Sequence, residues 1–281
     1  MSLVFPHTGR AAHIGLTGPP GAGKSSLISA LCRHLRALGL TVGVLSVDPT
    51  SPFTQGALLG DRIRLSEHYL DPGVYIRSMG TRGTLGGVAE ATLQAGLVID
   101  AAGRDIVLYE TVGVGQSEIA IASLADVVAL VLMPGSGDSI QALKAGVMEI
   151  PDLVVLNKCD LPGASSARSE LAQVLRLADP GARPPLIETS AQTGEGVEAL
   201  WDAIVARRAE LERTGALAER RRASLEREVL GLASARAARG IEDALSGRDD
   251  LRSLLERVAA REVDPVRAVA EVLDRVYGIR E

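Results

Sequence analysis

The amino-acid sequence predicts an α/β fold, in which a mostly parallel β-sheet is flanked by helices and followed by a C-terminal helical arm. Short apolar runs alternate with longer helical patterns, a glycine-rich loop joins the first run to the first helical pattern, and the composition turns to Arg, Glu and Ala after residue 205. These features divide the 281 residues into an expected sheet domain over 1–210 and an expected arm over 211–281.

The apolar runs are the expected strands. They cover His13–Thr17, Val42–Val47, Val74–Ser78, Ile106–Tyr109, Val127–Met133, Leu153–Leu156 and Leu186–Glu188. Continuous apolar runs of this length, separated by helical patterns, are typical of parallel strands that are covered on both faces. The side chains that carry chemistry are then expected just past the carboxyl ends of the strands.

The loop after the first run fits the phosphate-binding pattern G-x-x-x-x-G-K-[ST], so the sheet domain is predicted to be a P-loop NTPase domain. Its residues are Gly18, Pro19, Pro20, Gly21, Ala22, Gly23, Lys24 and Ser25, with Ser26 in the helix behind. Glycines let backbone N–H groups curve round phosphate oxygens, and the helix N-terminus adds partial positive charge. We expect Lys24 to reach the β- and γ-phosphates and the Ser25 hydroxyl to ligate Mg²⁺.

Lysine is rare in this chain: of the 30 Lys and Arg residues, only Lys24, Lys144 and Lys158 are lysines. A lysine at a motif position is therefore informative. An arginine fork does not replace the compact ammonium of a phosphate-loop lysine. Lys144 follows a glycine-rich loop and a helix start. The residues alone leave it open whether Lys144 is functional or a solvated helix residue.

Three carboxylates are candidate partners for Mg²⁺, because that ion prefers oxygen ligands. Asp48 ends the second run, Asp61 lies in the following loop, and Glu110 ends the fourth run. The plainer alternatives are a cap or turn for Asp48, a solvated surface charge for Asp61 and an ordinary strand-end charge for Glu110. After Glu110, the Gly113 N–H is expected to meet the γ-phosphate, and Gln116 to orient water or a partner.

The strand over 153–156 ends in Asn157-Lys158-Cys159-Asp160, the guanine-reading pattern N-K-x-D. A carboxylate at Asp160 accepts both the N1–H and the N2–H of guanine, a pair of donors that adenine lacks. The Lys158 stem is expected to lie over the base and Asn157 to brace neighbouring loops. After the last strand, backbone N–H groups near guanine O6 are expected from Ser190, Ala191 and Gln192.

A glycine-rich segment over 75–87 carries two arginines, Arg77 and Arg82, and leads from the third strand to the next helix. It either brings an arginine near a nucleotide or a partner protein, or is a plain connection with solvated arginines.

The C-terminal residues carry apolar stripes at helical spacing, and Asp264-Pro265 has the pattern of a helix start. The stripes are Leu225, Val229 and Leu232; Leu251, Leu254, Leu255 and Val258; and Val266, Val269, Leu273 and Val276. A narrow helical layer must bury such stripes on the first domain or on a second copy of itself. We therefore expect a homodimer.

Composition argues against several other classes of protein. A net charge of −5 with one Trp, four Tyr and two Phe gives no basic or aromatic surface for nucleic acid. The longest apolar run is too short for a bilayer, and the N-terminus lacks a secretion pattern. Two cysteines imply no disulfide framework. We expect a soluble cytoplasmic protein with no membrane or nucleic-acid partner.

With these motifs in hand, the chain resembles the MeaB/ArgK family of GTPases, in the SIMIBI class of P-loop proteins. The likeness runs from about residue 13 to the C-terminus and is carried by segments 18–25, 47–51, 77–87, 110–118, 135–149 and 157–160. The acid-Thr-Val-Gly-Val-Gly-Gln run and the glycine-rich arginine loop are distinctive of that family. The phosphate and guanine motifs are shared by GTPases in general.

The resemblance implies a GTP-hydrolysing, homodimeric chaperone that gates cofactor loading and protection of an adenosylcobalamin-dependent acyl-CoA mutase. It implies Mg²⁺ and switch roles for Asp48, Asp61 and Glu110, and a further switch loop with Asp138 and Lys144. About a dozen residues precede the first strand, fewer than in familiar members. The mutase is therefore left open among methylmalonyl-CoA, isobutyryl-CoA and 2-hydroxyisobutyryl-CoA mutases.

Four alternatives stay open at this point. They are a metal-insertion GTPase, which should carry a His/Cys-rich tract; a protein-targeting GTPase, which should carry a Met-rich surface; a phosphotransferase linked to amino-acid transport; and a dimeric, nucleotide-switched binding module. Four His, two Cys and four Met argue against the first two.

Overall fold

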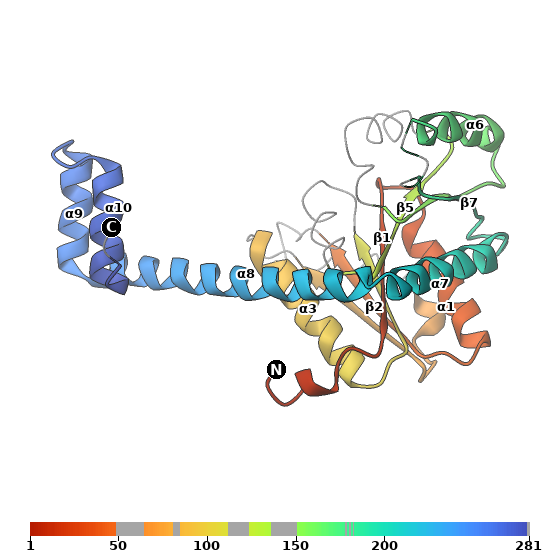
Figure 1. Ribbon diagram of the computed structural model, residues 1–281, viewed down its shortest axis with the longest axis horizontal. Helices are drawn as coiled ribbons and strands as arrows, with labels where there is room; N and C mark the ends of the chain where they lie inside the picture. The colour runs from red at the N-terminus through yellow and green to blue at the C-terminus, as the bar shows by residue number, and fades with distance from the viewer. Residues whose placement is uncertain are drawn as a thin grey trace. The chain divides into compact units, whose positions relative to one another are not determined.

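The computed structural model describes residues 1–48, 65–80, 85–111, 124–135, 151–177, 179, 181 and 183–279, without the side chains of 48, 80 and 85–90. Its centre is a seven-stranded sheet in the order β3-β2-β4-β1-β5-β6-β7 (Figure 1). Every pairing recorded among the described residues is parallel, which confirms the predicted fold class. The strands are β1 Ala12–Thr17, β2 Val42–Asp48, β3 Val74–Gly80, β4 Ile106–Thr111, β5 Val127–Leu132, β6 Leu153–Leu156 and β7 Leu186–Glu188.

Helices cover both faces of the sheet, because side chains alternate along each strand. On one face, Ile14, Leu108 and Val131 pack against α1 (Lys24–Ala37) and α7 (Val197–Arg213). On the other, Val107 and Tyr109 pack against α3 (Leu85–Ala101), and strands β5 and β6 pack against α6 (Ala164–Leu175). Short 3₁₀ turns lie at Phe5–His7 (η1) and Ser66–His68 (η2).

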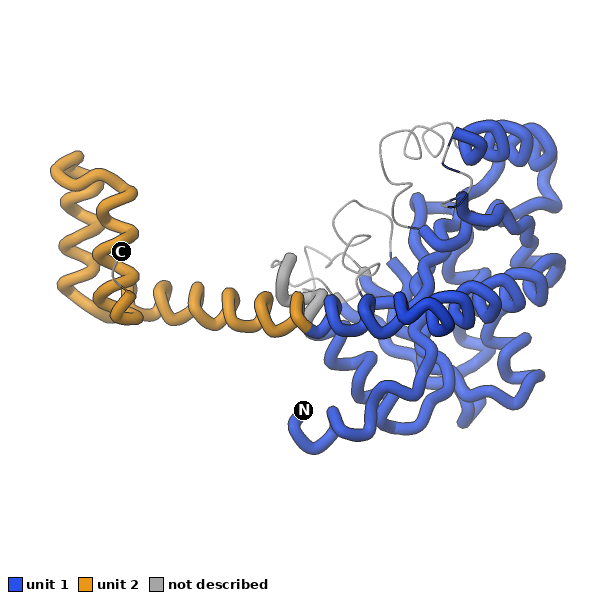
Figure 2. The backbone as a smooth tube through the Cα atoms, viewed as in Figure 1, with its two compact units in different colours: residues 1–225 blue, residues 226–281 orange. Residues whose placement is uncertain are grey.

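The chain divides into two compact units, residues 1–225 and 226–281 (Figure 2). The division lies inside α8 (Ala216–Gly247), whereas the boundary expected from composition, 210/211, lies inside α7. The second unit consists of the end of α8 with α9 (Asp249–Ala259) and α10 (Pro265–Tyr277). The functional boundary between domain and arm stays a prediction.

The helix start at Asp264-Pro265 is confirmed, since the Asp264 carboxylate accepts from the backbone N–H groups of Val266 and Arg267, both at 3.0 Å. The apolar face expected for this helix is wrong in part. Val266 and Val269 are 80% and 56% exposed, and the buried positions are Ala268 and Val272. Two apolar stripes run along α10, and the one at 268 and 272 joins the core with Leu251 and Leu254.

Carboxylates hold the amino ends of the strands together. Asp105 accepts from the Thr41 N–H at 2.8 Å, Asp126 from the His13 N–H at 3.0 Å and Asp152 from the Val128 N–H at 3.0 Å. Each of these acids directly precedes a strand and bonds the backbone of the neighbouring chain segment. This edge of the sheet is therefore closed by fixed polar contacts.

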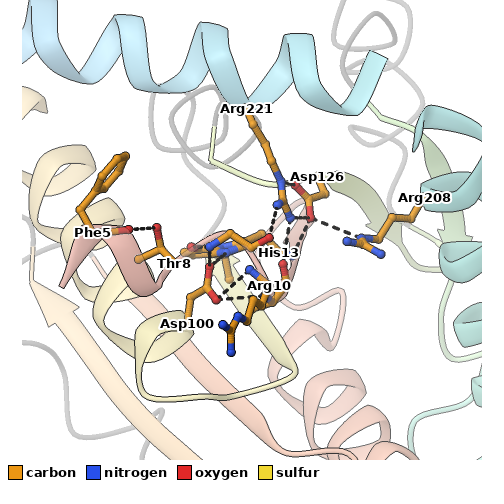
Figure 3. A network of polar contacts seen from close by, with 11 residues as sticks. Phe5, Thr8, Arg10, His13, Asp100, Asp126, Arg208 and Arg221 are labelled. Atoms are coloured by element: carbon orange, nitrogen blue, oxygen red, sulfur yellow. Dashed lines mark hydrogen bonds and ion pairs between the residues drawn. The ribbon is translucent and has the colours of Figure 1, made fainter. Parts of the chain in front are cut away.

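Arginines of α7 and α8 neutralise the two buried members of this set. Arg221 donates to both Asp126 oxygens at 2.8 and 2.7 Å, and Arg220 donates to both Asp152 oxygens at 2.8 and 2.9 Å. Figure 3 shows Arg221 pointing from its helix toward Asp126, with Arg208 on the opposite side of the carboxylate. The start of α8 is thereby fixed to the amino edge of the sheet. None of the described helices is both long and apolar enough to cross a bilayer.

Candidate nucleotide-binding site

The loop from Gly18 to Gly23 joins the buried strand β1 to the first turn of α1, at the carboxyl edge of the sheet. Gly18, Gly21 and Gly23 have φ values of 135°, 80° and 86°, a backbone region that favours glycine. A Cβ on Gly18 would lie 2.1 Å from the Val131 carbonyl oxygen. The loop can therefore curve this tightly only because this position lacks a side chain.

Lys24 is the first residue of α1, and its side chain folds back over the loop. Its Nζ donates to the carbonyl oxygens of Gly18 at 2.6 Å and Pro19 at 3.0 Å. The residue is only 6% exposed, so its charge is concentrated inside the curve of the loop. Such a placement suits a phosphate oxygen, which accepts stronger hydrogen bonds than a neutral carbonyl.

Ser25 and Glu110 meet beside the loop. The Ser25 hydroxyl donates to Glu110 Oε1 at 2.5 Å, and the Ser46 hydroxyl donates to Glu110 Oε2 at 3.1 Å. Glu110 is 2% exposed, so these two hydroxyls fix its carboxylate in one orientation. The hydroxyl and the carboxylate are hard oxygen donors of the kind that Mg²⁺ takes in nucleotide sites, where it binds few protein ligands. These residues therefore fit a magnesium ion.

Within the described ranges, His, Cys, Asp and Glu side chains form no group of three or more arranged to hold a metal ion. Asp48 lies at the end of β2, in register with Gly80, and its side chain is outside the described atoms. Asp61 lies outside the described residues altogether. Ser25 and Glu110 are thus the predicted metal ligands that the structure brings together.

Asn157 connects the phosphate loop to the loop after β7. Its Nδ2 donates to the Ala22 carbonyl at 2.9 Å, while its Oδ1 accepts from the Ala191 N–H and the Thr189 hydroxyl, both at 3.2 Å. The side chain is buried, and a Cβ on Gly23 would approach its Nδ2 to 2.5 Å. The Asn157 amide therefore fixes the spacing between the phosphate loop, 135 residues before it, and the loop after β7, 34 residues after it.

Lys158 has a φ of 62°, unusual for a residue with a side chain. This backbone directs its stem toward the phosphate loop, where its Nζ reaches Met133 Sδ at 3.5 Å and its Cε lies near Gly23. Asp160, two residues later, is exposed, so its carboxylate is accessible to a ligand. Burial first, and then the nearby Glu195 and Asp160 carboxylates, raise the pKa of the intervening Cys159 thiol.

The loop after β7 is held in place by a backbone hydrogen bond of its own and by the Asn157 side chain. The Ser190 N–H donates to the Glu195 carbonyl at 2.9 Å, and the Ala191 N–H donates to Asn157 Oδ1. Ser190 and Ala191 are buried, whereas Gln192 is exposed. A base oxygen at this loop would therefore share the Ala191 N–H or take that of Gln192.

Several predicted residues lie outside the described residues, namely Gly113, Gln116, Asp138, Lys144 and Arg82. Two residues that the sequence analysis missed belong to the site. Ser46 supports Glu110, and Thr189 supports Asn157. Ser46 precedes Asp48 by two positions on β2, and this alternation was the one available signal that its side chain shares a face with a candidate ligand.

Residues 1–244 match the family model described as "Methylmalonyl Co-A mutase-associated GTPase MeaB". A protein of Pyrococcus abyssi that is named as a GTPase is 47% identical over 98% of this chain and 86% of its own length. The mouse "Methylmalonic aciduria type A homolog, mitochondrial" is 41% identical over 74% of this chain and 52% of its own length.

Among solved structures, one described as an LAO/AO transport system kinase aligns with a TM-score of 0.67 and 25% identity. The alignment covers 98% of this chain and 84% of that one. The likeness in fold thus extends over almost the whole chain.

Proposed function

This chain belongs to the MeaB family of mutase-associated GTPases, and from that membership we propose that it is a chaperone that gates cofactor loading of an adenosylcobalamin-dependent acyl-CoA mutase and protects that enzyme. The mutase role rests on the family, and the observation that carries nucleotide binding is the meeting of Lys24, the Ser25–Glu110 pair and Asn157 at one edge of the sheet. A triphosphate tail and a guanine base are bound by these groups and by Asp160.

In this proposal the phosphate loop binds GTP through its backbone N–H groups and Lys24, whose Nζ exchanges the Gly18 and Pro19 carbonyls for phosphate oxygens. Ser25 and Glu110, with Asp48 and Asp61 as further candidates, hold Mg²⁺. When bound, this ion neutralises charge on the β- and γ-phosphates. Asn157 keeps the base loop at a fixed distance from the phosphate loop. Hydrolysis by water at the γ-phosphate is expected to be slow without the partner.

Switching is proposed for the loops that follow β4 and β5. Gly113 and Gln116 sense the γ-phosphate, and Lys144 supplies charge when the mutase stimulates hydrolysis. Glu110 lies two residues before the first of these loops, and its buried carboxylate is held by Ser25 and Ser46. Loss of the γ-phosphate is thereby coupled to the loop that begins two residues later.

A comparison of nucleotide affinities tests the guanine-recognition part of the proposal. GTP is expected to bind far more tightly than ATP, and Asp160→Asn is expected to shift the preference toward xanthine nucleotides, because an amide offers a donor where the carboxylate offers acceptors. The measurement is a titration of each nucleotide by calorimetry. Equal affinity for ATP and GTP in the wild type would contradict the assignment of guanine.

A pull-down from the native host with a non-hydrolysable GTP analogue tests the partner. Recovery of a cobalamin-dependent mutase supports the chaperone role. Lys144→Ala is then expected to spare basal hydrolysis but to reduce its stimulation by that mutase. An equal loss of both rates would refute the switch role of Lys144.

A homodimer and a cytoplasmic location are further parts of this proposal. The second unit carries exposed apolar side chains on α10, at Val266 and Val269, which a second copy would cover. Both cysteines are free thiols, as expected in a reducing compartment.

A phosphotransferase is the second candidate, because the solved structure that aligns over 98% of this chain is described as a transport system kinase. The two candidates differ in the acceptor of the γ-phosphate. Radiolabelled phosphate appears in free form if water is the acceptor, and on a protein if the chain is a kinase.

A further inference from the structure

A groove lies between the edge strand β3 and the flank of helix α3, and its volume is about 530 Å³. From β3 it is lined by Tyr75, Arg77 and Met79, which alternate along the strand and so share one face of the sheet. From α3 it is lined by Ala95 and Val98 among others, which lie on one flank of the helix. Because α3 packs mainly over the more central strands, the face of β3 remains partly uncovered.

The groove is separate from the nucleotide site. Arg77 is in register with Leu45, and Leu45 with Tyr109, so all three side chains lie on the face covered by α3. The phosphate loop leads into α1, which packs on the opposite face. Arg77 also lies in the middle of its strand, away from the carboxyl edge. This position favours a partner protein over a nucleotide as the ligand of Arg77.

The charge of the groove is positive. Arg77 and Arg104 line it, and no Asp or Glu of the described chain does. Arg104 Nη1 donates to the neutral Pro72 carbonyl at 3.1 Å, and the acid that the Arg104 charge acts on, Asp105, does not line the groove. The whole chain carries a net charge of −5, so this local surplus contrasts with its surroundings. An occupant with a carboxylate is favoured here.

The rest of the groove surface is apolar and accessible. Val98 is 47% exposed and Tyr75 is 41% exposed, although both are large hydrophobic side chains. In the described part of the chain, β3 pairs with β2 alone, so its other edge presents backbone N–H and C=O groups. Free strand edges and apolar pockets are features of surfaces that bind a segment of another protein.

We propose that this groove binds a segment of the partner mutase in which an acidic side chain stands next to apolar side chains. The carboxylate pairs with Arg77 and Arg104, and the apolar side chains cover Tyr75, Met79 and Val98. This inference rests on the proposed function, because that function supplies the partner. It adds a mutase contact on a surface distinct from the nucleotide-responsive loops.

The test measures binding of purified mutase from the same organism by calorimetry, in the presence of a non-hydrolysable GTP analogue. Arg77→Glu reverses the charge at the centre of the groove, and Val98→Glu places a charge on its apolar wall. Each is expected to weaken mutase binding by roughly tenfold or more. GTP affinity and basal hydrolysis should stay at wild-type values, because neither side chain approaches the nucleotide site.

Matched controls use the same substitutions elsewhere. Val205→Glu changes a valine of α7 that is 46% exposed, close to the 47% of Val98. Arg176→Glu changes an exposed arginine at the end of α6. Both should bind mutase as the wild type does, and thermal unfolding of all four variants shows whether each is folded.

Three outcomes are distinguishable. Weakened binding in the groove variants alone supports the proposal. Wild-type binding in the groove variants overturns it while leaving the chaperone function intact. If the wild-type chain binds GTP but no mutase, the proposed function fails, and the groove proposal fails with it.

Discussion

Gly18 is the residue on which the shape of the phosphate loop depends most. Its φ of 135° and the 2.1 Å approach of a would-be Cβ to the Val131 carbonyl act together. Gly18→Ala is therefore expected to lower the free energy of unfolding by about 2–4 kcal/mol and to abolish GTP binding, because the loop must move away from β5. Chemical denaturation and a nucleotide titration measure the two effects.

Gly39→Ala separates backbone strain from the clash. Gly39 also has a positive φ, 80°, but no atom lies within 4 Å of the Cβ position. Gly39→Ala is expected to lower the free energy of unfolding by about 1 kcal/mol and to leave GTP affinity unchanged. If both variants bound nucleotide equally well, the close approach at Gly18 would have no functional consequence.

Ser46 is a second residue with a defined task, because its hydroxyl is one of two that orient the buried Glu110 carboxylate. Ser46→Ala removes that donor and leaves an oxygen of Glu110 buried without it, at a cost of about 1–3 kcal/mol. We expect the Mg²⁺ concentration needed for tight GDP binding to rise several-fold, while binding in excess Mg²⁺ is restored. A wild-type magnesium dependence would show that the Ser46 hydroxyl is not needed to orient Glu110.

At the scale of elements, the amino edge of the sheet depends on ionised carboxylates. Burial alone would raise the pKa of Asp126, but hydrogen bonds and charge from Arg221, with the His13 N–H, hold it below its usual value. Burial would likewise raise the pKa of Asp100, but hydrogen bonds from the His13 side chain and from the Ala11 and Gly9 N–H groups outweigh burial and lower that pKa. Figure 3 shows that the two acids lie on either side of His13.

The sign of the pH dependence follows from these lowered values. A carboxyl whose pKa is lower in the folded state stabilises the fold above its unfolded pKa, near 4, and loses that contribution as the pH falls through the folded pKa. Stability is thus expected to fall steeply below about pH 4. Asp126→Asn should cost about 3–5 kcal/mol at pH 7, since it leaves Arg221 without its buried partner. The difference in free energy of unfolding between Asp126→Asn and the wild type should become smaller as the pH falls below about 4.

Asp250→Asn is the control for this prediction. Asp250 also has a lowered pKa, caused first by its hydrogen bond from Arg248, but its carboxylate lies at the surface. Its loss should change the acid-unfolding midpoint far less than the loss of Asp126. Parallel thermal melts between pH 3 and pH 7 make the comparison. If the stability difference between Asp126→Asn and the wild type stayed constant from pH 3 to pH 7, ionisation of Asp126 would not be the source of the acid sensitivity.

The sequence predicted the strands and the phosphate loop because their signals are local. A continuous apolar run and a glycine pattern need no knowledge of distant residues. The amino-edge contacts were not predicted, because Asp126 and Arg221 are 95 residues apart in the sequence. Without the structure, each of these two residues resembles an ordinary solvated charge. The face of α10 was mispredicted for a related reason. Two apolar stripes satisfy helical spacing, and contact with α9 selects between them.

The candidate site shows the same contrast between local sequence motifs, which were predicted, and contacts between distant residues, which were not. Lys24, Ser25, Glu110 and Asn157 were identified by motif, and the structure brings them to one edge of the sheet. Ser46 was missed, since a serine inside a buried strand has no motif of its own. Its role exists only because β2 and β4 are neighbours in register, with Ser46 beside Glu110.

At the scale of the whole molecule, three surfaces have distinct tasks. The carboxyl edge of the sheet carries the candidate nucleotide site, the amino edge is fixed by carboxylates and arginines, and the groove at β3 is the proposed partner surface. If the groove binds mutase as proposed, its separation from the nucleotide site allows mutase to remain bound while GTP is hydrolysed.

The proposed dimer gives the last prediction. In the second unit, Leu254 and Val272 are buried, whereas Val266 and Val269 are 80% and 56% exposed on the same helical unit. Exposed apolar side chains in such a small unit are expected to be covered by a second copy. Sedimentation velocity at micromolar concentration should give a dimer for the wild type and a monomer for the double variant Val266→Glu, Val269→Glu. Val205→Glu, on the first unit, should remain dimeric, and basal GTP hydrolysis should be the same in all three. A monomeric wild type, or a double variant that still dimerises, would rule out this surface as the dimer interface.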